Sequence, residues 1–168
     1  EWPFKYKKLY PEKVKARAYQ AYKELGGWGA GVADGFFGTL ADEVGYPFNQ
    51  IPPEAFAGLA AGYGQATLCG SLGAAATCIG VVCDKDMQKK LIAELFNWYK
   101  DHNFPEYQPE NLGLVQTVAK SLLCADSVGK FMEAQGVAYD DPKRKARCAG
   151  VTAEVAAKVV ELLNENLG

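Results

Sequence analysis

Five cysteines hold most of the chemistry available to this 168-residue chain, because it has only one histidine. They are Cys69, Cys78, Cys83, Cys124 and Cys148. No two of them are close enough to form a CxxC pair. Thiolates are soft metal ligands and redox groups, and no other residue type supplies such groups in quantity here. The sequence therefore predicts that any chemistry of this protein uses sulfur.

Helix geometry limits which cysteines can act together. If residues 69–83 form one helix, its rise of 1.5 Å per residue puts Cys69 and Cys78 about 13 Å apart along the axis, on opposite faces. The same rise per residue puts Cys83 about 21 Å from Cys69 along the axis, on the same face. A disulfide needs Cα atoms within roughly 7 Å, and a small metal centre needs similar proximity. A metal site would therefore take one cysteine from this run and the others from elsewhere.

Cys69 is the best candidate ligand in the run. Gly70 follows it, and Gly62 and Gly64 precede it, so the backbone can approach a cofactor closely and offer N–H groups to sulfur. By contrast, Cys78 and Cys83 stand among apolar residues and are predicted to pack in the core.

Two downstream cysteines have neighbours that favour a thiolate. Cys124 comes just before a predicted helix start at Asp126, where the helix dipole stabilises negative charge. Cys148 sits beside basic residues that lower a thiol pKa if their charges point inward. For these two cysteines and Cys69, core packing and metal binding remain equally open on composition alone. The basic neighbours are Arg144, Lys145 and Arg147.

Other motifs give little support for alternative chemistry. The segment 62–67 shares only two glycines with a dinucleotide fingerprint. No P-loop, HExxH or GxSxG motif occurs, and the absence of CxxCH means that covalent c-type haem is not predicted. His102, after a predicted helix end, is interpreted as a solvated or helix-end residue rather than a ligand.

Composition bounds the class of protein. The net charge is −2, so no basic surface for nucleic acid is predicted. The longest apolar run, residues 68–83, is shorter than the roughly 20 residues that a bilayer requires, which favours a buried helix and no membrane span. The sequence opens at Glu1 rather than methionine, and we expect a removed leader or a trimmed terminus.

The hydrophobic pattern is helical nearly throughout and predicts one all-α domain, residues 1–168, with a glycine-rich buried helix. Pro11 and Gly26 mark the ends of the first helix, and Asp84 or Asp86 opens a clear amphipathic helix. Small residues four apart in segment 28–44 predict close packing against another backbone. A loop is expected at 102–111. The remaining predicted helices are 112–123, 126–135, 142–148 and 152–164.

Three spaced elements resemble a known family. They are Leu-Cys-Gly at 68–70, Ser-x-x-Cys at 121–124 and Arg-Cys-Ala at 147–149. In this order they are similar to segments of the split-Soret cytochromes c and of the broader C-GCAxxG-C-C group of redox proteins. The resemblance covers roughly residues 25–165.

The resemblance implies an exported, periplasmic, mostly helical redox protein that is often a dimer and exchanges electrons with a partner such as a cytochrome. It implies an iron–sulfur cluster or related centre with Cys69, Cys124 and Cys148 as ligands. The cofactor contacts would be Gly62, Gly64, Gly70 and Trp28. This chain departs from the family in two ways. Near residues 26–31, where the family carries one or two cysteines, it has Trp28 and glycines. The haem motifs of the split-Soret cytochromes c are also missing. Three thiolates also fall short of the usual four for a cluster.

These observations leave two main hypotheses and a weaker third. The first is an electron-transfer protein with an iron–sulfur or related centre on the three cysteines. The second is a cofactor-free helical binding or assembly module in which Trp28 and Tyr63 line an apolar pocket or a subunit contact. A thiol-based redox enzyme is disfavoured, because no cysteine has a nearby partner or histidine base.

Overall fold

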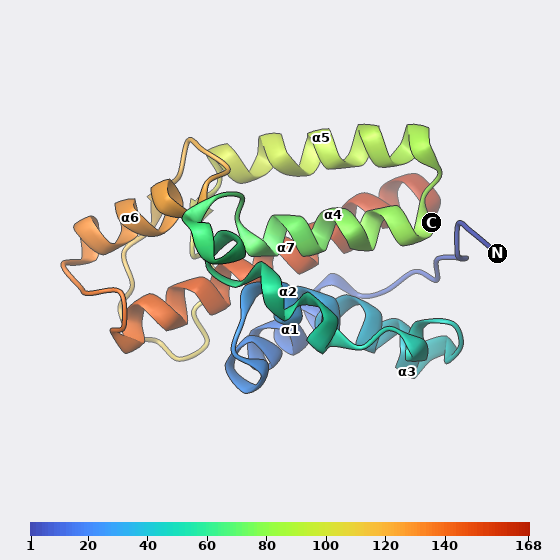
Figure 1. Ribbon diagram of the computed structural model, residues 1–168, viewed down its shortest axis with the longest axis horizontal. Coiled ribbons are helices and arrows are strands. Elements are labelled where there is room, and N and C mark those ends of the chain that lie inside the picture. Colours follow the sequence, from blue (N-terminus) through green and yellow to red (C-terminus); the bar gives the residue numbers. More distant parts are fainter.

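The computed structural model describes residues 1–168, and it is built almost entirely from helices (Figure 1). The only sheet is a two-stranded antiparallel pair, β1 (Asn103–Phe104) and β2 (Thr117–Val118). The prediction of an all-α fold is therefore confirmed. The helices are α1 (Pro11–Leu25), α2 (Trp28–Ala33), α3 (Thr39–Val44), α4 (Gly70–Val82), α5 (Lys85–Asp101), α6 (Cys124–Gln135) and α7 (Pro142–Leu167).

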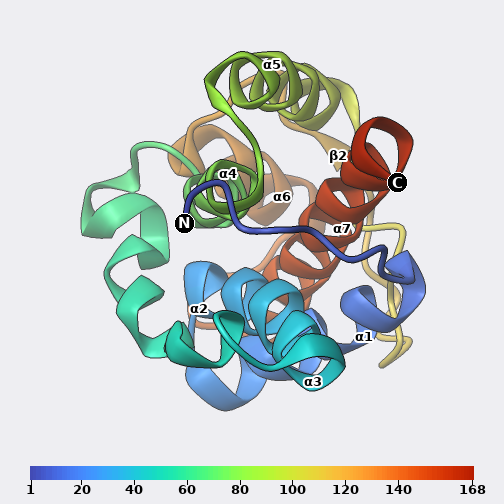
Figure 2. The same ribbon diagram turned by 90° about the vertical axis from the view of Figure 1, so that its right-hand side faces the viewer.

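Helix α7 is the centre of the molecule. It contacts α1, α2, α4, α5 and α6, and Figure 2 shows it passing between these helices. Asp141 begins α7 by accepting a hydrogen bond from the backbone N–H of Lys143, and Pro142 occupies the first helical position, where its missing N–H costs nothing. Most of its residues are buried, so this helix carries the largest share of the core.

The small residues in segment 28–44 allow close helix packing, as predicted. A Cβ added to Gly31 would lie 2.7 Å from the Thr152 side chain of α7, and one added to Gly35 would lie 2.7 Å from the Cβ of Ala18. The segment is not one regular helix, because a π-helical turn at Asp34–Gly38 separates α2 from α3. Such turns are rare and occur mostly as single π-bulges inside α-helices.

Helices α4 and α5 lie side by side and place two cysteines at opposite ends of α4 (Figure 1). Cys69 is the residue that precedes α4, and Cys83 is the residue that follows it. Asp84 begins α5 as predicted, since its side chain accepts a hydrogen bond from the N–H of Met87 at 2.9 Å. None of the helices, the apolar α4 included, has the length and hydropathy needed to cross a bilayer.

Two sequence-based predictions of local structure are wrong. Residues 112–123 are not helical: β2 lies within them and pairs with β1, and Gly113 and Lys120 adopt positive φ values that interrupt a right-handed helix. Residues 142–148 and 152–164 belong to one continuous helix, α7. Gly150 does not break it, but allows Pro105 and Tyr107 to approach within 2.9 Å of the place a Cβ would occupy.

The chain between α3 and α4 is irregular and unusually strained. Pro53–Leu59 forms 3-10 helical turns, and the segment that follows adopts left-handed backbone conformations. Non-glycine residues pay roughly 1–2 kcal/mol each for such a conformation. Strain of this kind is often found at functional sites. The left-handed residues are Ala61 (φ 55°), Gly62 (59°), Tyr63 (61°), Gly64 (70°) and Ala66 (55°).

Candidate metal centre

Two of the three predicted ligands are joined by backbone pairing. Leu68 and Leu123 form an isolated antiparallel bridge. The N–H of Cys69 donates to the carbonyl of Leu122 at 3.0 Å, and the N–H of Cys124 donates to the carbonyl of Thr67 at 2.6 Å. Cys69 therefore lies opposite Leu122 and Cys124 opposite Thr67, so the two cysteines flank the bridge, and α4 and α6 start from them. Both helix dipoles favour negative charge at this point.

Cys148 joins this pair from the start of α7. Burial, together with the neighbouring Cys69 and Cys148, raises the pKa of the Cys124 thiol to about 11, so both other cysteines lie close enough to act on Cys124. All three side chains are buried and none forms a disulfide. The structure thus brings together the three cysteines that the sequence predicted to be ligands. That they bind a metal stays a prediction.

Cys78 and Cys83 lie apart from this group. Burial raises the pKa of Cys78, with no other cysteine contributing, and burial together with Asp84 raises the pKa of Cys83 to about 11. All five cysteines belong to the main hydrophobic core, so what sets these two apart is that no other thiol and no arginine acts on them. Their position agrees with the prediction that they pack as small apolar groups.

Two arginines from α7 surround the cysteine group without any carboxylate partner. Arg147 is 1% exposed and Arg144 is 4% exposed, and neither forms an ion pair with an aspartate or glutamate. Nη1 of Arg147 lies 3.8 Å from the sulfur of Cys148, while its Nε has no hydrogen-bond partner. An unpaired buried cation is costly, so this arrangement indicates that the site holds negative charge.

The thiol of Cys148 raises the pKa of both arginines. Burial alone lowers the pKa of Arg147, but the charges of Cys148 and Tyr99 outweigh it and leave this pKa above its ordinary value. The pKa of Arg144 is also raised, because its interactions with Cys148 offset burial. Both guanidinium groups therefore remain charged.

Tyr99 and Ser127 complete the polar lining of the site. The hydroxyl of Tyr99 donates to Oγ of Ser127 at 3.0 Å, and Nη2 of Arg147 donates to the same oxygen at 2.7 Å. Burial raises the pKa of Tyr99, and the charge of Cys69 contributes to the same shift. A chain of polar groups therefore links α5, α6 and α7 beside Cys69.

The glycines predicted to contact a cofactor play different parts. A Cβ on Gly62 would lie 2.6 Å from the N of Thr67 and 3.0 Å from the Cβ of Cys124, so only glycine fits there. Gly64 also has a positive φ but has open space around it. A Cβ on Gly70 would lie 2.3 Å from the carbonyl oxygen of Leu59, so this glycine admits protein backbone.

Trp28 lines a pocket beside the arginines. Its ring packs edge-on against Tyr22, and the guanidinium carbon of Arg144 lies 5.5 Å from the ring centre. The pocket has a volume of about 500 Å³, and Tyr139 forms another part of its wall. Arg144 therefore connects Trp28 with the cysteine group, because the same guanidinium also interacts with Cys148.

The sequence predicted some of the residues around the three cysteines. Arg144 and Arg147 were predicted as neighbours of Cys148, but Tyr99 and Ser127 were not predicted to contribute to the site. Ser127 follows Cys124 by three residues, so helical spacing placed it on the same face of α6. No local signal identified Tyr99, because its spacing is that of an ordinary core residue of an amphipathic helix.

Comparison with known proteins extends the resemblance to the whole chain. A curated relative named "Split-Soret cytochrome c", from Desulfovibrio desulfuricans (strain ATCC 27774 / DSM 6949 / MB), is 29% identical over 171 residues. The match covers 95% of this chain and 60% of that relative. A solved structure reported as "A novel iron centre in the split-Soret cytochrome c from Desulfovibrio desulfuricans ATCC 27774" superposes with a TM-score of 0.91 at 27% identity, covering 98% of this chain and 72% of the other.

These findings overturn the expectation of an iron–sulfur cluster. The relative is a cytochrome, a haem-related protein, and its structure is described by a novel iron centre rather than by such a cluster. The arrangement here gives a physical reason, since the two remaining cysteines lie elsewhere and cannot supply the fourth thiolate that clusters usually require.

A family model described as "Putative redox-active protein (C_GCAxxG_C_C)" matches residues 32–162, which include all five cysteines. The match spans most of the chain and contains the cysteine group with its arginines. This chain therefore belongs to the C_GCAxxG_C_C family of redox-active proteins.

Proposed function

We propose that this protein transfers electrons through an iron ion bound by Cys69, Cys124 and Cys148. The observation that carries the proposal is the group of three buried thiols beside two buried arginines that have no carboxylate partner. The iron centre reported for the relative supports iron as the metal. Thiolates are soft ligands, and iron is commonly bound by them in proteins.

The residues of the site fit an anionic thiolate centre. Three thiolates would add three negative charges, and the two arginines would offset two of them at close range. The unpartnered Nε of Arg147 is a donor without an acceptor, as expected where an anion belongs. The ligand atoms of His102, Glu106 and Glu154 already lie close enough together to hold one ion. The sulfurs of the three cysteines are less close, so these side chains must move together to bind an iron ion.

The chain contributes more than ligands. Burial keeps water from the sulfurs, which strengthens their interactions with the arginines. The N-termini of α4 and α6 and the hydrogen-bonded Tyr99 and Ser127 add positive ends of dipoles around the site. When bound, iron supplies a one-electron redox couple. Fixed positive charges stabilise the more reduced form and therefore raise the reduction potential.

Cys124 connects the site with the surface. It lines a surface hollow of about 560 Å³, together with the apolar side chains of Val128 and Met132. We propose that an electron-transfer partner such as a cytochrome docks there. Export to the periplasm and dimerisation are proposals that rest on the resemblance to the split-Soret cytochromes.

A cofactor-free binding module is the second candidate. Trp28 replaces the first family cysteine, and it lines the pocket of about 500 Å³ together with Tyr22 and Tyr139. This pocket could take an organic ligand without any metal. The retention of three buried thiols around the arginines favours the iron-binding function over this one.

Iron content separates the two candidates. The protein is reconstituted with ferrous iron, without sulfide and without oxygen, and bound iron is measured after desalting. We expect wild type and the matched control Cys83→Ser to retain about one iron per chain, and Cys124→Ser to lose it, because a coordination bond is removed. Equal iron content in the two variants, or none in wild type, would contradict the proposal.

A further inference from the structure

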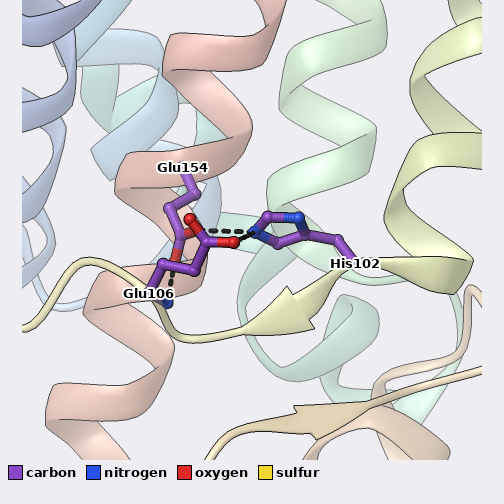
Figure 3. A group of neighbouring side chains, drawn as sticks. All are labelled: His102, Glu106 and Glu154. Atoms are coloured by element: carbon purple, nitrogen blue, oxygen red, sulfur yellow. Dashed lines mark hydrogen bonds and ion pairs between the residues drawn. The ribbon is translucent and has the colours of Figure 1, made fainter.

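A second group of metal-ligating side chains lies away from the cysteines, where β1 and the following loop meet α7. It consists of His102, Glu106 and Glu154, whose donor atoms all lie within 4.8 Å of one another. Figure 3 shows the imidazole of His102 directed at both carboxylates, with Glu154 contributed by α7. No residue of this group takes part in the proposed iron site.

The distances suit a single ion. Nε2 of His102 lies 2.7 Å from Oε1 of Glu154 and 3.7 Å from Oε1 of Glu106. Ligands bonded at about 2.0–2.2 Å to one ion stand at most roughly 4.4 Å apart. The set therefore closes on an ion by a small movement of Glu106, whose side chain is 62% exposed.

Two of the three ligands are already held in place. Glu154 is buried, and its Oε2 accepts hydrogen bonds from the backbone N–H groups of Glu106 at 2.9 Å and Tyr107 at 3.4 Å. The ring of His102 packs between Trp98 and Phe104, at centroid distances of 4.7 and 4.5 Å. Such outer contacts orient metal ligands and increase their affinity.

The charge around the group favours a cation. A pocket of about 260 Å³ opens beside it and gives room for water ligands. Four carboxylates and two lysines line this pocket, so its net charge is −2 when His102 is neutral. Of the two lysines, Lys15 is paired with Glu12 and Lys158 lies over the ring of Trp98. The charged residues beyond the ligand group are Glu12, Lys15, Lys158 and Glu161.

We infer that His102, Glu106 and Glu154 form a binding site for a divalent transition-metal cation such as Zn²⁺. One imidazole and two carboxylates are the borderline-hard donors that such ions accept, whereas the cysteine group offers only soft sulfur. The cation takes the place of the hydrogen bond between Nε2 of His102 and Oε1 of Glu154. This revises the interpretation of His102 as a solvated helix-end residue: it does end α5, but its side chain is largely buried against Glu154.

The single histidine of this chain provides a direct probe. Tag-free protein is titrated with ZnCl₂, and the imidazole ¹⁵N resonances of His102 are followed by NMR. We expect them to shift and saturate at one zinc per site, and Glu106→Gln to weaken this binding by about tenfold or more. Glu106 is exposed, so its substitution does not threaten folding. Glu161→Gln, which lines the same pocket without supplying a ligand, serves as the matched control and should change the affinity much less.

The outcome is independent of the iron proposal. Zinc that binds only to the cysteines leaves the imidazole resonances unchanged, and this result would overturn the inference while supporting a thiolate site. Equal zinc affinity in Glu106→Gln and wild type would overturn it as well. A shift of the imidazole resonances in a Cys124→Ser background would support it even if iron binding is lost.

Discussion

The two ends of α4 carry buried cysteines in opposite surroundings. Cys69 at the N-terminus lies near Cys124, Tyr99 and Arg147, whereas Cys83 at the C-terminus lies next to Asp84. Both thiols are shielded from water, so burial alone does not distinguish them. The difference is that buried arginines lie at the Cys69 end, whereas the charge next to Cys83 is the carboxylate of Asp84. Neighbouring charge, rather than the cysteine itself, makes one end a candidate redox site.

The largest effect is expected from removing the positive charge at the Cys69 end. Arg147→Met should lower the iron affinity about 10- to 100-fold, because the thiolates lose their closest compensating charge. The reduction potential of any iron retained should fall for the same reason. Iron titration and redox potentiometry measure both effects. Arg17→Met is the control, since Arg17 pairs with Asp34 and Asp42 away from the site, and an equal loss in both variants would refute the electrostatic account.

The next largest effect is expected on stability, from the strained segment 61–66 beside Cys124. Gly62→Ala should destabilise the protein by more than the roughly 1–2 kcal/mol expected for positive φ alone, because the added methyl group also collides with Thr67 and Cys124. Gly64→Ala has the same φ strain in open space, so it should cost only that smaller amount. Chemical denaturation of both variants gives the difference. If they are equally stable, the close packing of Gly62 against Cys124 is not real.

A smaller effect should appear inside α4, at Cys78. Cys78→Ala removes a fully buried sulfur from the hydrophobic core, which should cost about 1 kcal/mol in the free energy of unfolding. Iron content should remain that of wild type, because Cys78 has no contact with the thiol group. A loss of iron in Cys78→Ala would show that iron binding depends on the core packing around Cys78.

Alkaline pH should weaken the metal-free fold modestly. Burial raises the pKa of Cys83 and of Cys124 from the ordinary 9.0 to about 11, so the folded protein holds these protons more tightly than the unfolded chain. This stabilisation is present below pH 9 and is lost as the pH rises to about 11. Denaturation curves across this range should show the decline, and Cys83→Ser should make it shallower. A flat profile would mean that these thiols are not protected by the fold.

Local signals explain what the sequence could predict. Pro11 and Gly26 mark α1, and the side chain of Asp84 begins α5, because each acts within one helical turn of its own position. The helix expected at 112–123 failed because Thr117 and Val118 pair with residues 103 and 104, a distant contact that overrides local propensity. The residues of the candidate site show the same contrast between local signals and distant contacts. The three cysteines were found through their family resemblance, but Tyr99 reaches Ser127 only through the tertiary fold.

The central claim is that iron binds to sulfur at the Cys69 end of α4. Iron K-edge X-ray absorption of the ferrous-reconstituted protein tests it most directly. We predict sulfur neighbours at about the 2.3 Å typical of metal–thiolate bonds, reduced in Cys124→Ser and unchanged in Cys83→Ser. A spectrum with only nitrogen and oxygen neighbours would contradict the account and would place the iron elsewhere, for example at His102, Glu106 and Glu154.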